Sequence, residues 1–394
     1  MIHPKIKESV KKYQAAMIDF RRELHRHPEL PWEEIETTKR IAKELDKIGV
    51  TYRLTEPTGI IADIKGGKPG KTVALRCDID ALPVMELNDS IEYKSTVPGK
   101  MHACGHDAHT AMLLTAAKVL NEIKDELPGN VRLIFQPAEE LAEGALAMIK
   151  QGALDGVSNV FGMHIWSVTP SGKVSCVVGS SFASADIVKV RFKGRGGHGS
   201  MPHECVDAAV VASSFVMNLQ AIVSRESHPL DPAVVSIGLM DVGTRFNVIA
   251  ENAYLEGTVR CFTLQDSQRI EAAIRRYAEH TAAMYGATAE VEYLRMTLPV
   301  INEENSAKLA QTIVLEAFGK DAVYTERPTT GAEDFSFYTE KVPGCFALVG
   351  TRNAEKGSDQ AHHHGCFNVD EDSMATGVEL YVQYAWNYLN QDQF

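Results

Sequence analysis

The sequence lacks the features that mark a membrane-embedded or exported protein. No run of eighteen apolar residues occurs in the 394-residue chain, so no transmembrane helix is expected. The N-terminus, M-I-H-P-K-I-K-E, has no apolar core of the kind that a signal peptide needs. The seven cysteines are odd in number and follow no regular spacing, which argues against a disulfide framework. These absences favour a reducing compartment, and the cytoplasm is the simplest one.

Positive charge, repeats and nucleotide-binding glycine loops are also scarce. Lys and Arg number 40 against 52 Asp and Glu, and the formal net charge of −12 disfavours nucleic acid as a partner. There is no low-complexity tract and no repeat of fixed period. No G-x-G-x-x-G follows the early predicted strands, which argues against a Rossmann dehydrogenase.

The chain does have the length and the apolar content for about two domains, because 44% of its residues are hydrophobic. In the first half, strands alternate with helices, which is typical of a three-layer α/β domain with a mostly parallel sheet. Helices are predicted at 5–27, 33–48, 108–126 and up to Gln151, and strands at 50–54, 60–65, 72–77, 131–136, 158–165 and 173–178. Functional groups are expected at the carboxyl ends of such strands.

From about Ala183 the pattern changes to that of a second domain. The stretch D-I-V-K-V-R-F alternates as a half-exposed strand does. A helix at 206–225, strands at 233–241 and 253–261, a helix at 267–285 and a strand at 288–294 complete the order β-α-β-β-α-β, which is the ferredoxin-like plan. After Pro299 the α/β pattern resumes with a helix at 305–318, a strand at 345–349 and a final helix at 371–389. We therefore predict a discontinuous first domain, 1–182 and 298–394, with 183–297 inserted into it.

A cluster of potential metal ligands occupies Met101–Thr110, which reads M-H-A-C-G-H-D-A-H-T. Cys104 and His106 are two positions apart, so both side chains can point the same way in a tight loop, and Gly105 lets the backbone turn between them. Thiolate and imidazole suit zinc and its first-row neighbours better than magnesium or calcium. The next ten residues predict a helix, which places the cluster at a helix N-terminus. The alternative is a buried free cysteine beside solvated histidines.

Four further segments carry groups of the same kind. Phe135–Glu140 (F-Q-P-A-E-E) follows a predicted strand, and its adjacent glutamates project differently, so one could bind a metal while the other holds a proton. Gly162–Trp166 (G-M-H-I-W) places a histidine near the end of an apolar strand. His362–Cys366 (H-H-H-G-C) supplies three histidines, and Gly194–His203 is a glycine-rich loop in the inserted domain.

Each segment by itself has an ordinary explanation as an acidic helix start, a core histidine or a polar loop. Nine of the fourteen histidines nevertheless fall in these segments and in the first cluster, which favours one metal site over separate coincidences. His25 and His27, which flank the break before Pro28, are instead expected to cap and pack. Asp78 and Asp80 emerge at the end of the strand predicted at 72–77.

Taken together, the motifs resemble those of one family. They are C-G-H-D-A-H-T, F-Q-P-A-E-E, G-M-H, the G-G-H-x-S-x-P-H loop, F-N-V-I, G-T-V-R, G-A-E-D-F and the late histidine before x-x-x-F. The family is that of the aminoacylase-like metallohydrolases, in the branch that holds hippurate hydrolase, bacterial N-acetyl-amino-acid deacetylases and plant auxin-conjugate amidohydrolases. The motifs run in the family's order from about residue 21 to 377. The resemblance implies a di-metal α/β catalytic domain and an inserted lid that mediates dimerisation.

Matched position by position, the resemblance implies a set of metal ligands. Cys104, His106 and Glu140 correspond to ligands, and His164 corresponds to a ligand on the other metal. The late ligand corresponds to His363, because the family places it four residues before an aromatic residue. Here that aromatic residue is Phe367, and the adjacent His362 and His364 stay open as alternatives.

The resemblance also implies roles for residues that bind no metal. Glu139 corresponds to the general base, and Asp80 to the acid that orients the site from behind the ligands. His198 and Asn247 correspond to lid residues that reach the substrate, and in this family the lid histidine serves the neighbouring subunit. Arg260 is a candidate partner for a substrate carboxylate. Two departures, Gly365 and Ala250 where the family usually has proline, loosen loops without removing a functional group.

The activity that the resemblance implies is hydrolysis of an N-acyl amino acid by water activated on two divalent ions per subunit, with zinc, manganese, cobalt and nickel as candidates. The implied partners are that small-molecule substrate and a second copy of the chain, joined in a homodimer through the lid; neither nucleic acid nor a membrane is expected. Two alternatives stay open. A dipeptidase of the same family would have to recognise a free ammonium group, and a non-catalytic metal-binding scaffold would not need Glu139.

Overall fold

The computed structural model describes residues 2–391, which form two compact units. Unit 1 holds the chain up to Gly179, Ile301–Arg327 and the part from Asp334 onwards, and unit 2 holds Ser180–Val300 and Pro328–Glu333. The sequence placed the two divisions at 182/183 and 297/298, and it did not assign the short segment Pro328–Glu333 to the inserted domain.

Unit 1 is built on an eight-stranded sheet with the order β1-β2-β4-β3-β5-β16-β6-β15. Its strands are β1 (Thr51–Leu54), β2 (Ile60–Lys65), β3 (Lys68–Asp78), β4 (Pro128–Gln136), β5 (Asn159–Pro170), β6 (Val174–Ser175), β15 (Val323–Tyr324) and β16 (Gly344–Arg352). The pairs β3–β4, β3–β5, β5–β16 and β6–β15 are parallel, and the other three neighbouring pairs are antiparallel. The mostly parallel sheet predicted from the alternating elements is therefore confirmed.

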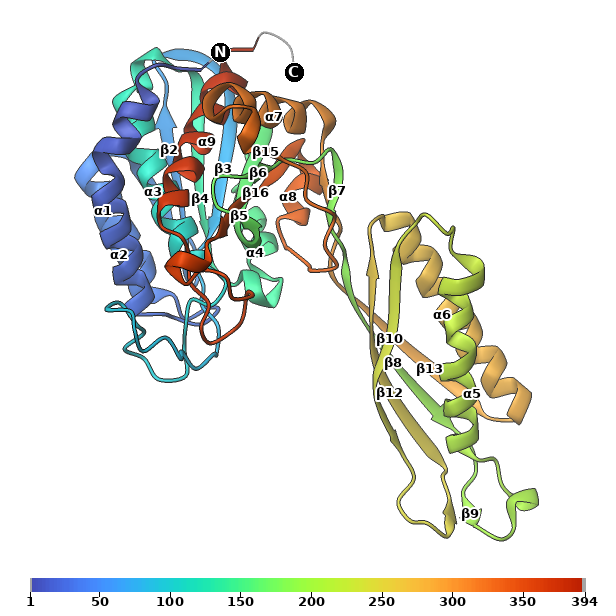
Figure 1. The fold of residues 1–394 in the computed structure, drawn as a ribbon. Helices are drawn as coiled ribbons and strands as arrows, with labels where there is room; N and C mark the ends of the chain where they lie inside the picture. Colours follow the sequence, from blue (N-terminus) through green and yellow to red (C-terminus); the bar gives the residue numbers. More distant parts are fainter. Residues whose placement is uncertain (1, 392–394) are drawn as a thin grey trace. The chain divides into compact units, whose positions relative to one another are not determined.

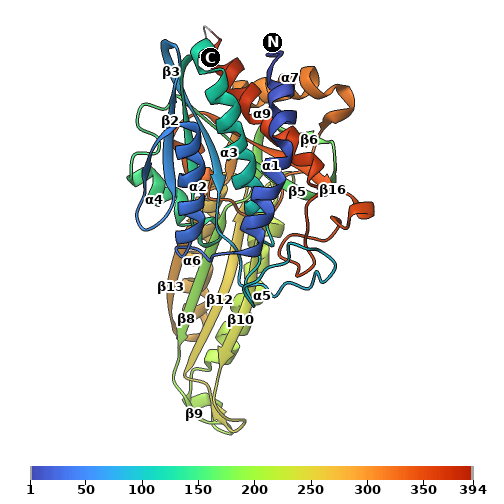
Figure 2. The same cartoon turned by 90° about the vertical axis from the view of Figure 1, so that its left-hand side faces the viewer.

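Helices cover both faces of this sheet. On one face lie α1 (Ile6–Arg26), α2 (Ile35–Ile48), α3 (His106–Glu122) and α9 (Asp372–Leu389), with α7 (Glu304–Phe318) against α9; on the other lie α4 (Gly144–Lys150) and α8 (Ser336–Lys341) (Figure 1). Figure 2 shows α1, α2 and α3 side by side in front of the strands. Helix α3 is buried on nearly all sides, because α1, α2, α9 and the sheet surround it.

Element boundaries differ from the sequence predictions where tertiary contacts decide them. Helix α3 begins two residues early, at His106, because Gly105 takes a left-handed φ of 87° at its N-cap. A Cβ at Gly105 would also lie 2.2 Å from Cδ1 of Ile165, so only glycine fits there. Strand β5 runs to Pro170, beyond the predicted end at residue 165, because its pairing with β16 continues as far as Arg352.

Unit 2 consists of an antiparallel four-stranded sheet with two helices on one face (Figure 1). Its elements are β8 (Ala185–Lys193), α5 (Ala208–Ala221), β10 (Ala233–Val242), β12 (Asn252–Cys261), α6 (Leu264–Tyr285) and β13 (Thr288–Thr297). The strand order β10-β12-β8-β13, with every neighbouring pair antiparallel, is the ferredoxin-like arrangement. Alternate residues of β8, namely Val188, Val190 and Phe192, are buried beneath the helices. The short strands are β7 (Gly179–Phe182), β9 (Gly197–His198), β11 (Val248–Ile249) and β14 (Val300–Asn302).

One helix of unit 2, Ala208–Glu226, is long and apolar enough to cross a membrane by length and composition alone. The core helix of a folded unit passes the same test, and this helix packs against α6, β8, β10 and β12. Its Val211, Phe215 and Leu219 are fully buried in the core of unit 2. Packing within the unit accounts for this buried side, while Val210 and Met217 of the same helix are exposed.

Candidate metal centre

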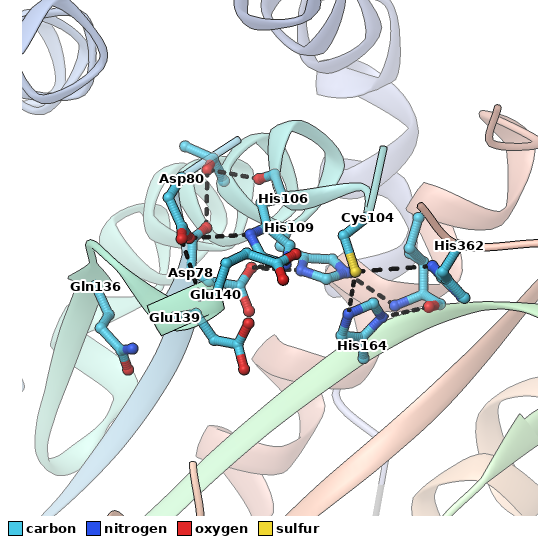
Figure 3. A network of polar contacts seen from close by, with 12 residues as sticks. Asp78, Asp80, Cys104, His106, His109, Gln136, Glu139, Glu140, His164 and His362 are labelled. Atoms are coloured by element: carbon cyan, nitrogen blue, oxygen red, sulfur yellow. Dashed lines mark hydrogen bonds and ion pairs between the residues drawn. The ribbon is translucent and has the colours of Figure 1, made fainter. Parts of the chain in front are cut away.

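The carboxyl ends of three neighbouring strands of unit 1 meet the N-terminus of α3 at one place (Figure 3). Asp78 ends β3 and Asp80 follows it, the two glutamates follow β4, and His164 lies within β5. Cys104 and His106 come from the first turn of α3 and the loop before it. Since parallel strands direct their carboxyl ends to one edge of a sheet, segments far apart in sequence come together here.

Cys104 belongs to two groups of potential metal ligands. One group is Cys104, His106 and His164, the other is Cys104, Glu140 and His363, and within each group the donor atoms all lie within 4.8 Å of one another. The Sγ atom of Cys104 lies 3.4 Å from Nε2 of His164, and Oε1 of Glu140 lies 3.4 Å from Nε2 of His363. A thiolate shared by two sets of donors fits a pair of metal ions with one bridging ligand.

Asp80 fixes the orientation of two of these donors. Its Oδ1 lies 3.0 Å from Nδ1 of His106, which donates the hydrogen bond, and its Oδ2 accepts the backbone N–H of Glu140 at 3.0 Å. Nε2 of His106 is buried and has no hydrogen-bond partner among the described residues, and the buried Oε1 of Glu140 faces it at 3.9 Å. Because an unpaired buried polar atom costs about 1–3 kcal/mol, this nitrogen and the carboxylate oxygen opposite it fit a cation bound between them.

A hydrogen bond also fixes the orientation of the His164 ring. Its Nδ1 donates to the carbonyl oxygen of Ile165, so the neutral ring carries its lone pair on Nε2, which faces Cys104. Burial, and then the neighbouring His109, hold the pKa of His164 well below its usual value. His164 is therefore a neutral imidazole whose lone pair is directed at Cys104. A histidine that binds a metal ion must be neutral and must have such a lone pair.

His109 lies in the same cluster but has no lone pair to offer. Its Nδ1 donates to Oδ1 of Asp78 at 2.6 Å, and its Nε2 accepts the backbone N–H of Ile165 at 2.9 Å. Asp78, His106 and His109 do place donor atoms within 4.8 Å of one another, yet both ring nitrogens of His109 are already committed. The motif C-G-H-D-A-H contains both histidines, and the family resemblance assigned only His106 to the metal.

Glu139 stands beside the two donor groups on the short 3-10 turn Glu139–Leu141. One of its oxygens lies within 4.8 Å of donor atoms of His106 and Glu140, and its Oε1 accepts the backbone N–H of Asp334 at 3.4 Å. The turn starts at Ala138, which has a left-handed φ of 50° and whose N–H is held by the buried Glu34 at 2.9 Å. The two adjacent glutamates thus have different partners, since Oε1 of Glu139 accepts the N–H of Asp334 while Oε1 of Glu140 lies 3.4 Å from Nε2 of His363.

A buried network behind the centre was only partly foreseen. His25, expected to pack rather than bind metal, contacts Oδ2 of Asp107 at 2.8 Å and Oε1 of Glu86 at 3.2 Å. Arg21 is fully buried and lies 2.7 Å from the same oxygen of Asp107. Asp107 directly follows His106, so this network anchors the first turn of α3. The sequence R-R-E-L-H puts Arg21 and His25 one helical turn apart, and this spacing could have predicted that the two side chains share a partner.

The lid candidates lie in unit 2, where the structure brings two of them together. Val248 of β11 pairs with His198 of β9, and the N–H of Gly199 donates to the carbonyl oxygen of Asn247 at 2.9 Å. Arg260 lies near the other end of the sheet, where β12 pairs with the start of β8. Arg260 lies eight positions along β12 from Asn252, which corresponds to a length of about 26 Å.

Comparison with known proteins places the chain in a family. The model of peptidase family M20/M25/M40 matches residues 74–387. The chain is 39% identical over 391 residues to thermostable carboxypeptidase 2 of Saccharolobus solfataricus, covering 98% of this chain and 99% of that one. It is 40% identical over 378 residues to N-acetylcysteine deacetylase of Bacillus subtilis, covering 95% and 97%.

A solved structure agrees with these relatives. The crystal structure of the Bacillus subtilis YXEP protein, described as a dinuclear metal-binding peptidase of the M20 family, has a TM-score of 0.86 at 36% identity and covers 96% of this chain and 99% of that one. The chain therefore belongs to peptidase family M20/M25/M40, and it is a hydrolase of that family. The family resemblance inferred from the motifs is confirmed.

Proposed function

We propose that this protein is a metal-dependent amidohydrolase that cleaves the amide bond of N-acyl-L-amino acids. The observation that carries the proposal is the shared thiol of Cys104, which joins two donor sets beside a second carboxylate, Glu139. The relative named N-acetylcysteine deacetylase supports an acylated amino acid as the substrate class.

Two divalent ions fit the donors described above. Cys104, His106 and His164 would hold one, and Cys104, Glu140 and His363 would hold the other. One soft thiolate with three imidazoles and one carboxylate favours zinc, cobalt or nickel, with manganese also within the range of such ligands. Ions bound there would supply Lewis acidity and make a water molecule acidic near neutral pH.

The remaining steps belong to side chains of the protein. Glu139 would accept the proton of the attacking water and pass it to the leaving nitrogen. Its carboxylate lies close to the potential metal ligands but belongs to neither of the two groups that contain Cys104. Asp80 would keep Nε2 of His106 directed at the site by holding its Nδ1. The backbone N–H of Asp334 would hold the Glu139 carboxylate in position between these transfers.

His198 is suited to stabilising the oxyanion that forms on the substrate carbonyl. Its Nδ1 accepts the backbone N–H of Ser200 at 3.2 Å, so a neutral ring carries its proton on the exposed Nε2. An exposed N–H donor is what an oxyanion requires. The backbone carbonyl oxygen of Asn247 accepts the N–H of Gly199, the residue after His198. Asn247 would therefore approach the substrate together with His198.

The separation of the lid candidates supports catalysis across a homodimer. The substrate's carboxylate and its scissile amide are about one residue apart, ~3.6 Å. Arg260 lies ~26 Å along β12 from Asn252, the end of that strand that follows β11 and its partner His198. This length supports two different chains as the source of His198 and Arg260 at one substrate. We therefore place His198 and Asn247 in the partner subunit's site and Arg260 in the site of its own chain. Strand β10 is an open sheet edge with exposed Leu239 and Met240, which suits pairing with a second copy.

A second candidate activity is removal of a C-terminal amino acid from a peptide, and it is favoured by the relative named carboxypeptidase. Both substrates present a carboxylate one residue from the scissile amide, so the same groups would serve. The test is hydrolysis by the metal-loaded protein of N-acetyl and N-benzoyl amino acids, N-blocked dipeptides and free dipeptides. Faster cleavage of the simple N-acyl amino acids supports the proposal. Preference for free or blocked dipeptides would replace it with a peptidase, and hydrolysis of none would leave a metal-binding scaffold.

A further inference from the structure

His362 lies against the shared thiol but is held differently from its neighbour His363. Its Nδ1 lies 3.8 Å from Sγ of Cys104 (Figure 3). Its ring is packed between Trp166 and Phe367, with ring centroids 4.9 and 5.0 Å away. His363, by contrast, is 53% exposed, has a left-handed φ of 66° and places its Nε2 3.4 Å from Oε1 of Glu140. The two adjacent histidines therefore approach Cys104 from different environments.

A backbone amide decides where the proton of His362 sits. The N–H of Ser167 donates to Nε2 of His362 at 3.1 Å. A backbone N–H is always a donor, so Nε2 must be the unprotonated nitrogen, and in the neutral ring the proton is on Nδ1. A nitrogen that carries a proton has no lone pair for a metal ion. His362 is therefore excluded as a ligand, although a distance of 3.8 Å from the thiol would suit two ligands of one metal.

We propose that His362 is a positioning residue that donates an Nδ1–H···Sγ hydrogen bond to the thiolate of Cys104. The inference rests on the proposed metal centre and adds a residue that tunes it. A thiolate that gave one lone pair to each of two ions would keep a third lone pair for a hydrogen bond. The contacts with Trp166 and Phe367 and the bond from the Ser167 amide hold the ring with Nδ1 towards Cys104.

Such a bond has two measurable consequences. Metal binding requires the thiol to lose its proton, and an N–H donor stabilises the resulting anion; losing a partner of this kind typically lowers metal affinity about 10–100-fold. The same donor lowers the energy of the sulfur electrons, so the charge-transfer absorption from thiolate to bound cobalt should lie at shorter wavelength when the bond is present.

The test compares His362→Phe with His362→Asn in the full-length protein loaded with Co²⁺. Phenylalanine keeps the packing between Trp166 and Phe367 but has no donor. Asparagine places an N–H close to the position of Nδ1. Both substitutions leave the Ser167 amide without its acceptor, so the difference between them isolates the bond to sulfur. His364→Phe is the matched control, because His364 is exposed and its Nδ1 accepts the N–H of Cys366 at 3.0 Å.

We expect all three variants to bind two Co²⁺ per chain. In His362→Phe the charge-transfer band should move to longer wavelength and Co²⁺ affinity should fall about 10–100-fold. In His362→Asn both should return most of the way to the wild-type values, and His364→Phe should match the wild type. A stoichiometry of one Co²⁺ in both His362 variants would make His362 a ligand and overturn the proposal. Equal spectra for His362→Phe and His362→Asn, or the same shift in His364→Phe, would also overturn it.

A measurement on the wild-type protein needs no substitution that could disturb folding. Long-range ¹H–¹⁵N correlation spectra of the zinc-loaded protein report which nitrogen of each histidine carries the proton. We expect the Nδ1–H form for His362; the Nε2–H form would refute the proposal. Wild-type protein that binds Co²⁺ without any thiolate band would instead refute the metal centre itself, and this outcome is distinguishable from the others.

Discussion

Oδ1 of Asp80 lies 3.0 Å from Nδ1 of His106, while the other oxygen of the same carboxylate accepts the backbone N–H of Glu140 at 3.0 Å. One buried carboxylate thus orients a candidate ligand from α3 and another from the turn after β4. Because rigid support of this kind decides how precisely a site is formed, the contact links the fold directly to metal binding.

The first prediction follows from this contact. Asp80→Asn should keep the fold but lower metal affinity about 10–100-fold, because the amide holds Nδ1 of His106 less firmly than a carboxylate does. Competition with a chromogenic chelator measures the affinity. Asp125→Asn, at an exposed carboxylate on the 3-10 turn Lys124–Glu126, is the control and should bind as the wild type does. Wild-type affinity in Asp80→Asn would show that Asp80 does not support the site.

The second prediction separates the two adjacent glutamates. Glu139→Gln should retain both metals and lose roughly 10²–10⁴-fold in kcat, since it removes only the proton acceptor. Glu140→Gln should instead lower the metal content, because it weakens a donor of the Cys104, Glu140 and His363 group. Metal analysis and turnover, measured on the same preparations, distinguish the two effects. Normal turnover in Glu139→Gln together with normal metal content in Glu140→Gln would show that the F-Q-P-A-E-E motif has been misassigned.

The third prediction concerns His198 and the homodimer. His198→Ala should lower turnover about 10²–10³-fold, the usual cost of losing an oxyanion donor. If His198 acts in the partner's site, mixing His198→Ala with Glu139→Gln subunits gives mixed dimers in which one site carries both defects and the other carries none. Activity should therefore return on mixing.

The control for this experiment is subunit exchange, followed with differently tagged chains. Mixed dimers of wild type and Glu139→Gln, made in the same way, give the activity expected for one intact site per dimer. If exchange is complete and the mixture of the two variants stays inactive, His198 acts within its own chain.

The fourth prediction concerns pH and the buried Glu34. Burial, and then the charge of Asp80, raise the pKa of Glu34 to about 7. A carboxyl group whose pKa is raised by folding binds its proton more tightly in the folded chain, so its contribution to stability is full below the unfolded pKa of 4.5 and is lost as pH rises towards 7. The loss across this window is roughly 3 kcal/mol, since one pKa unit corresponds to about 1.4 kcal/mol.

Glu34→Gln should flatten this part of the stability profile. Glutamine can still accept the Ala138 N–H and contact the Thr58 hydroxyl, but it has no proton to lose. Chemical unfolding at pH 5 and pH 7.5 measures the difference for both proteins. Glu36→Gln, at an exposed position two residues away, should keep the wild-type profile. An unchanged slope in Glu34→Gln would place the titration elsewhere.

The sequence by itself determined much of the fold and the composition of the site. Apolar periodicity predicted most helices and strands, because a buried face imposes a period on the side chains whatever lies opposite. The concentration of histidines in a few loops predicted a metal centre, and the spacing of Cys104 and His106 showed that both side chains could face it. The family motifs added Glu140, His164 and His363 by resemblance. The structure places all of these in the two donor groups that share Cys104.

Only the tertiary structure decided which histidines have a lone pair to give. His109 and His362 lie within the same motifs as His106 and His363, yet each accepts a backbone N–H from β5, from Ile165 and from Ser167 respectively. These donors are 56 and 195 residues away along the chain, so no local pattern could reveal them. The tertiary fold likewise put His198 in the small β9–β11 sheet and Arg260 in the four-stranded sheet, at the opposite end of β12 from Asn252. A sequence names the residues that could bind a metal, but hydrogen bonds made across the fold decide which nitrogen of each ring is available.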